Sequence, residues 1–226
     1  MDVNTLAVAL IGVGGTLGGT LGGAVLSQRA VRAQAAEQNR RADRERDEGR
    51  AERAFEAKRE LYARLNTAAR AYRVAARDAV EAAERGEGVD PALLDAAKEA
   101  WAEQYSQAQM ALSNEVLDVA SALNRSLGVG YSVVKDLPDS PRLDEAYRRA
   151  KTWFGGSLSD GVYLLRVTLR HDLGVEVEPG FEQSRTRMLA ALGSARDSLA
   201  HALAAERGAA RAGHAASHAL RSRATP

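Results

Sequence analysis

The first part of the chain is an uncharged, apolar run. Leu6 to Leu26 contains nine Leu, Ile or Val residues and no charged residue. As an α-helix these 21 residues would be roughly 32 Å long, which is enough to cross the hydrocarbon core of a bilayer. Seven glycines lower the hydrophobicity and helix propensity of the run. The pattern still predicts a transmembrane anchor within residues 1–28.

The glycines of this run repeat with a period of four. On a helix they form two adjacent rows, which consist of Gly14, Gly18, Gly22 and Gly15, Gly19, Gly23. Small residues at positions i and i+4 let two helix backbones approach closely within a membrane. We therefore predict a helix–helix interface at these six glycines and a homo-oligomer. The alternative is that the glycines only reflect tolerated low complexity.

A charged stretch without large apolar side chains follows the anchor. Within residues 39–53, 11 of 15 side chains are charged. Such a segment has no face to bury, so we predict a solvated helical stalk over residues 29–54. Ion pairs at i,i+4 spacing, Arg41 with Glu45 and Arg44 with Glu48, are expected to support it.

Basic residues close to one end of the anchor predict its direction. Arg29, Arg32, Arg40 and Arg41 follow the apolar run, whereas Asp2 is the only charged residue before it. Basic flanks remain on the cytoplasmic side. We expect a single-pass protein of the cell membrane, with its N-terminus outside and its body in the cytoplasm. A secretory signal is disfavoured because no Lys or Arg precedes the run.

Helix-type apolar spacing begins at Phe55 and predicts an all-α bundle over residues 55–181. The first seam consists of Leu61, Leu65, Ala68, Tyr72, Ala75 and Ala79. Glycines at 86 and 88 end this helix, and Asp90 with Pro91 provides a cap and a first-turn proline for the next one. We expect the second helix to run to Gly128 and to form an antiparallel hairpin with the first.

Similar signals predict the remaining helices. After a loop at 129–139, Ser140 and Pro141 indicate another start, and a stripe of Leu143, Tyr147, Ala150 and Phe154 follows. Gly155 and Gly156 predict a kink before an apolar face that ends at Gly174. This gives an antiparallel bundle of three or four helices. Residues 182–226 form a basic, Ala-rich tail, expected to be helical to 207 and disordered from Gly208.

Charge is distributed unevenly along the chain, although the net charge is only +1. Residues 27–85 carry 15 basic and 11 acidic side chains, residues 86–181 carry 9 and 15, and residues 182–226 carry 7 and 3. Basic flanks suit anionic lipid surfaces, but they could equally dock on the acidic middle or on nucleic acid. The chain has no cysteine, which excludes disulfides and thiolate chemistry.

Candidate catalytic and metal-binding residues lack the patterns that their chemistry needs. Ser157 and Ser159 are not placed in a GxSxG elbow, and Gly12 with Gly14 would need glycine at Leu17 for a dinucleotide-binding loop. Two further pairs have the i,i+4 spacing of metal ligands on a helix but lack the additional ligands that a metal site needs. These pairs are Glu99 with Glu103 and His214 with His218. We expect no enzyme, no cofactor and no metal site, and Trp101 and Trp153 are expected in the core, so nucleic acid is an unlikely partner.

The exit from the anchor resembles a known group of proteins. An uncharged anchor, the residues Leu26-Ser27-Gln28-Arg29 and the later Arg59-Glu60-Leu61-Tyr62-Ala63 resemble small single-pass actinobacterial membrane proteins of the conjugal-plasmid spread or Kil type. The resemblance covers about the first 80 residues. It implies a role in plasmid transfer, and it transfers no functional residue.

Two functions fit these features. The leading hypothesis is a membrane-tethered helical scaffold that self-associates and presents its bundle to an unknown cytoplasmic protein partner. The alternative is a small pore-forming or toxin-like protein in which the glycine-striped helix is the effector. Expression of residues 1–40 alone distinguishes them, because only the second function predicts growth arrest or ion leakage.

Overall fold

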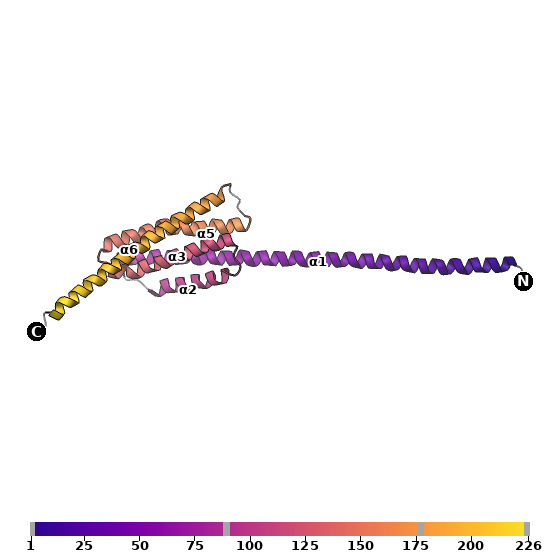
Figure 1. Cartoon of the computed structure of the whole chain (residues 1–226), viewed down its shortest axis with the longest axis horizontal. Coiled ribbons are helices and arrows are strands. Elements are labelled where there is room, and N and C mark those ends of the chain that lie inside the picture. Colours follow the sequence, from indigo (N-terminus) through magenta and orange to yellow (C-terminus); the bar gives the residue numbers. More distant parts are fainter. Residues whose placement is uncertain (1–2, 88–90, 176–178, 224–226) are drawn as a thin grey trace. The chain divides into compact units, whose positions relative to one another are not determined.

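The structure is a computed structural model that describes the backbone of residues 3–87, 91–175 and 179–223. Side chains are described at positions 32 and 211 and over 34–87, 91–175 and 179–209. The secondary-structure elements among these residues are all helices, with no strand (Figure 1). The all-α prediction is therefore confirmed. The chain divides into two units, Met1–Glu56 and Ala57–Pro226.

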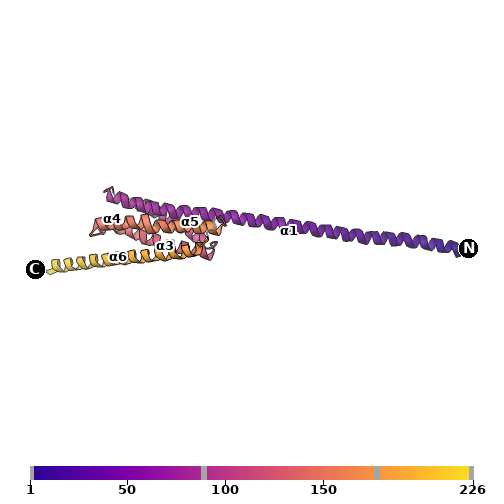
Figure 2. The same cartoon turned by 90° about the horizontal axis from the view of Figure 1, so that it is seen from above.

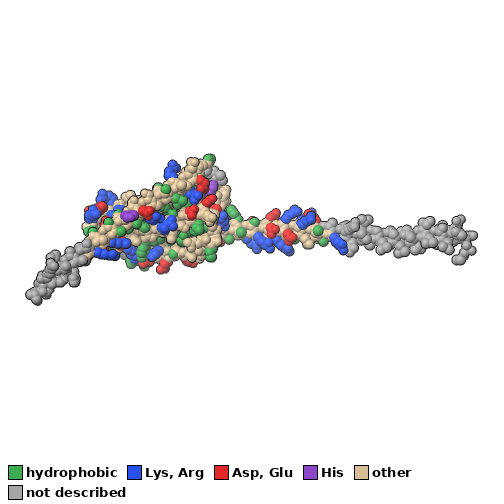
Figure 3. All heavy atoms as spheres, in the orientation of Figure 1, with side chains coloured by type: hydrophobic (Ala, Val, Ile, Leu, Met, Phe, Trp, Pro, Cys, Tyr) green, Lys and Arg blue, Asp and Glu red, His purple; other side chains and the backbone are tan. Residues whose placement is uncertain are grey.

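The first unit consists of the beginning of helix α1 (Val3–Glu84). Figure 3 shows basic side chains, all of them arginine in this unit, interspersed with Asp and Glu along its described part. The ion pairs here are Arg41–Glu37 at 3.2 Å, Arg46–Asp43 at 3.2 Å and Arg50–Asp47 at 3.1 Å. The predicted pairs Arg41–Glu45 and Arg44–Glu48 were wrong. Helical side chains lean toward the N-terminus, so each arginine here reaches back to an acid three or four residues earlier.

The predicted anchor lies outside the residues whose side chains are described. Across those residues, no helix has the length and hydropathy needed to span a bilayer. Only the helical backbone is described for residues 3–31. The glycine rows and Arg29 fall in this stretch, so membrane insertion and the glycine interface stay predictions.

The second unit is a helical bundle. Besides the end of α1, it contains α2 (Pro91–Ala108), α3 (Asn114–Asp136), the 3₁₀ turn η1 (Leu137–Asp139), α4 (Leu143–Thr152), the π-helical turn η2 (Trp153–Ser157), α5 (Leu158–Asp172) and α6 (Phe181–Arg223). Helices α3 and α5 form the middle of the bundle, with the end of α1 on one side and α6 on the other (Figures 1 and 2).

The apolar seam of α1 faces this middle layer. Leu61, Leu65, Ala68 and Tyr72 are buried, as predicted. Beyond Tyr72 the buried positions are Ala76 and Val80, one residue later than the predicted Ala75 and Ala79. An α-helix has 3.6 residues per turn, so a seam drawn at 3.5-residue spacing drifts off the buried face. Phe55 belongs to the first unit and is 47% exposed.

The predicted helix from Pro91 to Gly128 is in fact two helices. Helix α2 ends at Ala108, and the backbone of Ser113 is extended, with φ −63° and ψ 157°. The apolar spacing continues through Leu112 and Val116, so periodicity could not reveal the reversal. Two hydrogen bonds fix α2 antiparallel to α3: Trp101 Nε1 donates to Asn124 Oδ1 at 2.8 Å, and the Tyr105 and Ser121 hydroxyls lie 2.9 Å apart.

Glycines in α3 do not end the helix, so the predicted stop at Gly128 and the loop at 129–139 were wrong. Gly130 of α3 faces the two aromatic residues of η2. A Cβ added there would stand 3.0 Å from Phe154 Cε1 and 3.1 Å from Trp153 Nε1. Glycine therefore serves packing at this position, and α3 continues to Asp136.

The following helices partly match the predictions. α4 begins at Leu143, and Arg142 occupies the N-cap position instead of Ser140. Leu143 is 44% exposed, although it was placed on the apolar stripe. The predicted irregularity at Gly155 and Gly156 is confirmed as the π-helical turn η2. Gly174 ends the next helix as predicted, with φ +70°.

Helix α6 belongs to the bundle, which therefore extends beyond residue 181. Leu192, Leu199 and Leu203 are buried in the same core as the other helices. Gly161 of α5 permits this contact, because a Cβ there would lie 3.0 Å from Leu192 Cδ2. α6 continues to Arg223, where disorder was expected from Gly208. Its alanines have the highest helix propensity of any residue, which explains the continuation.

Substitution of alanine at two glycines of α3 tests the close packing. Gly130→Ala should lower the free energy of unfolding by about 1–3 kcal/mol, because its methyl group would press on two buried rings. Gly128→Ala should raise it by about 0.5–1 kcal/mol, because this position is open and helical. Denaturant unfolding of the full-length protein measures both. Equal stability of the two variants would contradict the packing role of Gly130.

Candidate functional site: a basic groove between α1 and α5

A groove of about 210 Å³ lies between α1 and α5. Its lining residues are Asn66, Arg70 and Arg73 from α1 and Ser159, Val162, Tyr163 and Arg166 from α5. Both sets follow three- and four-residue spacing, which places each set on one face of its helix. Arginine is the only charged residue type in the lining. The groove is therefore positive.

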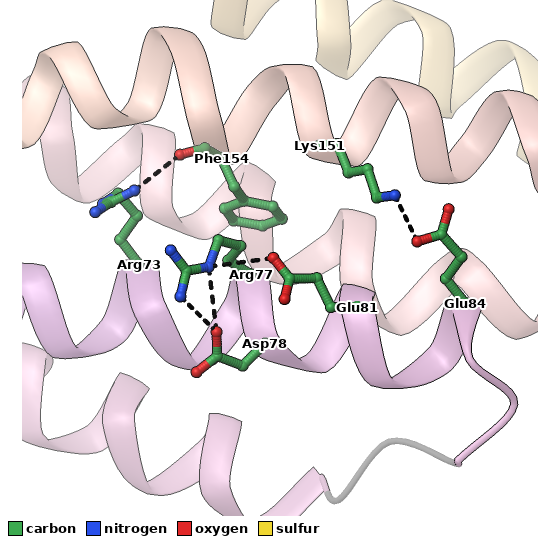
Figure 4. Close-up of polar contacts among 7 residues, drawn as sticks. All are labelled: Arg73, Arg77, Asp78, Glu81, Glu84, Lys151 and Phe154. Carbon is green, nitrogen blue, oxygen red and sulfur yellow. Dashed lines mark hydrogen bonds and ion pairs between the residues drawn. The ribbon is translucent and has the colours of Figure 1, made fainter.

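Arg73 differs from the neighbouring cations on this side of α1 because its only hydrogen-bond partner is a neutral one (Figure 4). Its Nη1 donates to the backbone oxygen of Phe154 at 3.2 Å. The neighbouring cations both face carboxylates. Arg77 lies 2.8 Å from Asp78 and 3.4 Å from Glu81, and Lys151 lies 2.5 Å from Glu84. Arg73 thus retains an uncompensated charge.

The other two arginines of the groove also lack an acidic partner within the described chain. Arg70 makes no hydrogen bond or ion pair there. The guanidinium of Arg166 lies over the Tyr163 ring, 5.1 Å from its centroid, which is a cation–π contact and leaves the charge in place. Three guanidinium groups therefore share one small groove without a carboxylate.

Burial and repulsion both act on Arg73. Burial lowers its pKa, and the positive charges of Arg77 and Arg70 lower it further. A guanidinium nevertheless remains protonated in proteins, so Arg73 keeps its charge. Two polar atoms of the groove residues, Arg73 Nε and Asn66 Oδ1, are buried without a hydrogen-bond partner. Unmet buried groups of this kind are uncommon in folded proteins.

The π-helical turn positions the carbonyl that holds Arg73. Trp153 and Phe154 are adjacent in sequence, and both are buried. The wider π turn allows both rings to reach the core, and such turns are frequent at functional sites. A Cβ at Gly155 or Gly156 would meet no atom within 4 Å, so these glycines are not required by packing. Their permissive backbone suits the irregular turn.

An ion pair fixes the two walls of the groove together near the end of α5. Lys58 Nζ of α1 lies 2.6 Å from Asp172 Oδ2, and the Tyr62 hydroxyl donates to the same oxygen. Burial alone would raise the pKa of Asp172, but the hydrogen bonds from Lys58 and Tyr62 outweigh it, so this pKa lies below its usual value. Burial, followed by the hydrogen bond to Asp172, raises the pKa of Tyr62.

Two larger grooves on the α6 side each contain an arginine that is paired with a carboxylate. One, of about 570 Å³, contains Arg207 and Asp136, whose Nη2 and Oδ2 are 2.6 Å apart. The other, of about 400 Å³, contains Arg149, which forms two 2.8 Å hydrogen bonds with Glu206. These pairs hold α6 against the bundle. Neither groove offers a set of unpaired like charges.

The residues proposed from sequence do not form this groove. Arg32, Arg40 and Arg41 are exposed on the first unit, while Arg29 and the six glycines lie outside the described side chains. Ser159 lines the groove, without a nucleophile elbow around it. In the part of the chain that is described, no cluster of His, Cys, Asp or Glu could hold a metal ion. The side chains of His214 and His218 lie outside the described ones.

Sequence reasoning missed the groove because it considered basic residues as a candidate site only beside the predicted anchor. The spacing of Arg70 and Arg73 beside the buried seam was a usable signal. Arg166 could not be added to them without knowledge of how α5 packs on α1. Comparison with known protein families, curated proteins and solved structures gave no match. The site therefore stands on its geometry, and the resemblance proposed from sequence stays an expectation.

Asp172→Asn tests the ion pair that joins the walls. Loss of the charge should lower the free energy of unfolding by about 1–3 kcal/mol at pH 7, because Lys58 is left without its partner. A lowered pKa stabilises the fold above the unfolded-state value of about 4, and this contribution is lost as the pH falls through the folded-state pKa. The difference between parent and variant should therefore narrow below about pH 4.

Denaturant unfolding at neutral and acidic pH measures this difference. The matched control is Asp160→Asn, an exposed carboxylate on the same helix. It should unfold like the parent at both pH values. An Asp172→Asn variant that behaves like this control would remove the proposed link between α1 and α5.

Proposed function

We propose that this chain is a membrane-tethered helical interaction protein. Its N-terminal segment anchors in the bilayer and self-associates, and its bundle binds a cytoplasmic partner through the basic groove. One observation carries the proposal: the helix that begins within the anchor sequence, at Val3, is the same helix that supplies Leu65 and Tyr72 to the bundle core. The helix that contains the anchor sequence thus also supplies one wall of the binding groove.

The side chains between these two parts support a spacer role. From residue 34 to 56 the side chains are exposed or partly exposed, and their ion pairs are local. Exposed local pairs contribute only a few tenths of a kcal/mol each. Arg32 and Arg40 are exposed and can meet anionic headgroups, which supports a cytoplasmic location of this stretch.

The groove supports a binding role for the bundle. Three arginines without acidic partners create a positive surface that steers and binds negatively charged groups. Arg70 and Arg166 are exposed, so a partner can reach them. The Phe154 carbonyl holds Arg73, and the Tyr163 ring lies against Arg166.

Membrane topology tests the tether. A reporter that is active only in the cytoplasm, fused after Arg53, should be active because basic flanks retain the body on that side. Alkaline carbonate should leave the full-length chain in the membrane pellet. A chain that carbonate extracts into the supernatant has no spanning anchor, and the proposal would then fail.

The glycine rows generate a prediction about assembly. Lipid provides no hydrophobic drive between helices, so close backbone packing must supply the attraction. Gly18→Leu together with Gly19→Leu should keep the chain in the membrane and abolish crosslinked dimers. Leu17→Ile with Leu21→Ile, on the opposite face, is the control and should crosslink like the parent. If the glycine variant crosslinks equally well, the glycine rows are not the interface.

A further inference from the structure

The three guanidinium groups of the α1–α5 groove have a more specific use than general attraction of negative charge. We infer that the groove binds a phosphate-type oxyanion through Arg70, Arg73 and Arg166. This inference rests on the proposed function, because it names the chemical group that the bundle recognises in its partner. The argument depends on the charges, the size of the groove and its unpartnered polar atoms.

The charges require an anion for their compensation. The fold brings Arg70 and Arg77 close enough to Arg73 to lower its pKa, so the groove without an anion contains repulsion. The carboxylates of Asp78 and Glu81 compensate the charge of Arg77, whereas Arg73 donates a hydrogen bond only to the neutral Phe154 carbonyl (Figure 4). A bound anion would convert this repulsion into charge-assisted hydrogen bonds, which are the stronger class of hydrogen bond.

Phosphate fits this arrangement better than a carboxylate. One guanidinium already satisfies a planar carboxylate elsewhere in this protein, where Arg85 forms 2.8 Å and 2.7 Å hydrogen bonds with Glu87. Three guanidiniums from two helices instead match an anion that carries about two charges and presents oxygens in several directions. The groove of about 210 Å³ is smaller than the roughly 300–1,000 Å³ of pockets for whole drug-sized molecules, so it suits a single anionic group.

The unpartnered polar atoms and the hydroxyl groups of the groove residues complement the same anion. Arg73 Nε is a buried donor without an acceptor, and a phosphate oxygen would accept from it. Asn66 Oδ1 is a buried acceptor without a donor, and the protonated oxygen of hydrogen phosphate would donate to it. Hydroxyl groups of Ser159 and Tyr163 complete the lining and can donate to further oxygens.

Titration with inorganic phosphate tests the inference on the full-length protein in maltoside micelles. The parent should show saturable binding of one phosphate per chain and a rise in Tm with phosphate concentration. Arg70→Gln with Arg166→Gln should weaken binding at least tenfold, because two of the three guanidiniums are lost. The matched control is Arg125→Gln with Arg187→Gln, which removes the same charge from exposed arginines outside the groove. It should bind like the parent.

Lysine replacements separate the fork geometry from charge alone. Arg70→Lys with Arg166→Lys preserves the charge and should bind phosphate with intermediate affinity, because lysine lacks the bidentate fork. This variant also decides the matter if the glutamine variant does not fold. Absence of saturable binding in the parent would overturn the inference. So would equal weakening in the groove variant and in its control, or parent-like binding by the groove variant.

A second arm identifies the source of the phosphate group. The titration is repeated in micelles that contain phosphatidic acid. A lipid headgroup that occupies the groove should compete and raise the apparent Kd for inorganic phosphate, whereas unchanged affinity indicates that a soluble partner supplies the group. If the topology test gives the expected result but the parent does not bind phosphate, only this inference is overturned. Extraction of the chain by carbonate overturns the tether alone.

Discussion

The bundle depends on the close contact between Gly130 of α3 and the Trp153–Phe154 pair of η2. Both rings are buried, and both approach Gly130, the glycine of α3 where an added Cβ would meet them. A regular α-helix turns 100° per residue, so two adjacent large side chains diverge from each other. The π turn and the missing Cβ together let both rings enter the same core. Because η2 connects α4 to α5, this contact also fixes where the chain passes from one helix to the other.

The groove is a consequence of the same contact. The Phe154 carbonyl at the π turn accepts from Arg73, so the packing of a ring into α3 also holds a cation of α1. At the other end of α5, Asp172 holds Lys58 and Tyr62. α1 is therefore fixed to the α4–α5 segment by polar contacts at two places about four helical turns apart along α1. The arginines between them cannot separate without breaking one of these contacts.

Much of the fold was accessible from the sequence, and the failures share a physical cause. Apolar spacing identified the α1 seam through Tyr72, and proline and glycine marked the start of α2 and the end of α5. The same spacing hid the break at Ser113, because Leu112 and Val116 keep the helical period across it. Gly128 was taken for a helix end, although an exposed glycine inside a helix costs only about 1 kcal/mol and the packing of α3 offsets it. Periodicity reports which residues are buried, and it does not report where the chain reverses.

The groove could be predicted from sequence only in part, because charge compensation is a three-dimensional property. Arg73, Arg77 and Arg70 are equivalent in a helical pattern of this composition, yet only Arg77 finds carboxylates, from Asp78 and Glu81. Arg166 is separated from Arg73 by 93 positions (166 − 73) and joins the site through the α1–α5 packing. An arginine that the fold holds in place without an acidic partner retains its full charge. The conformational entropy of its side chain has already been lost on folding. Arg73, which the Phe154 carbonyl holds, therefore binds an anion with less loss of conformational entropy than the exposed arginines of the first unit, whose side chains would have to be ordered by the anion itself.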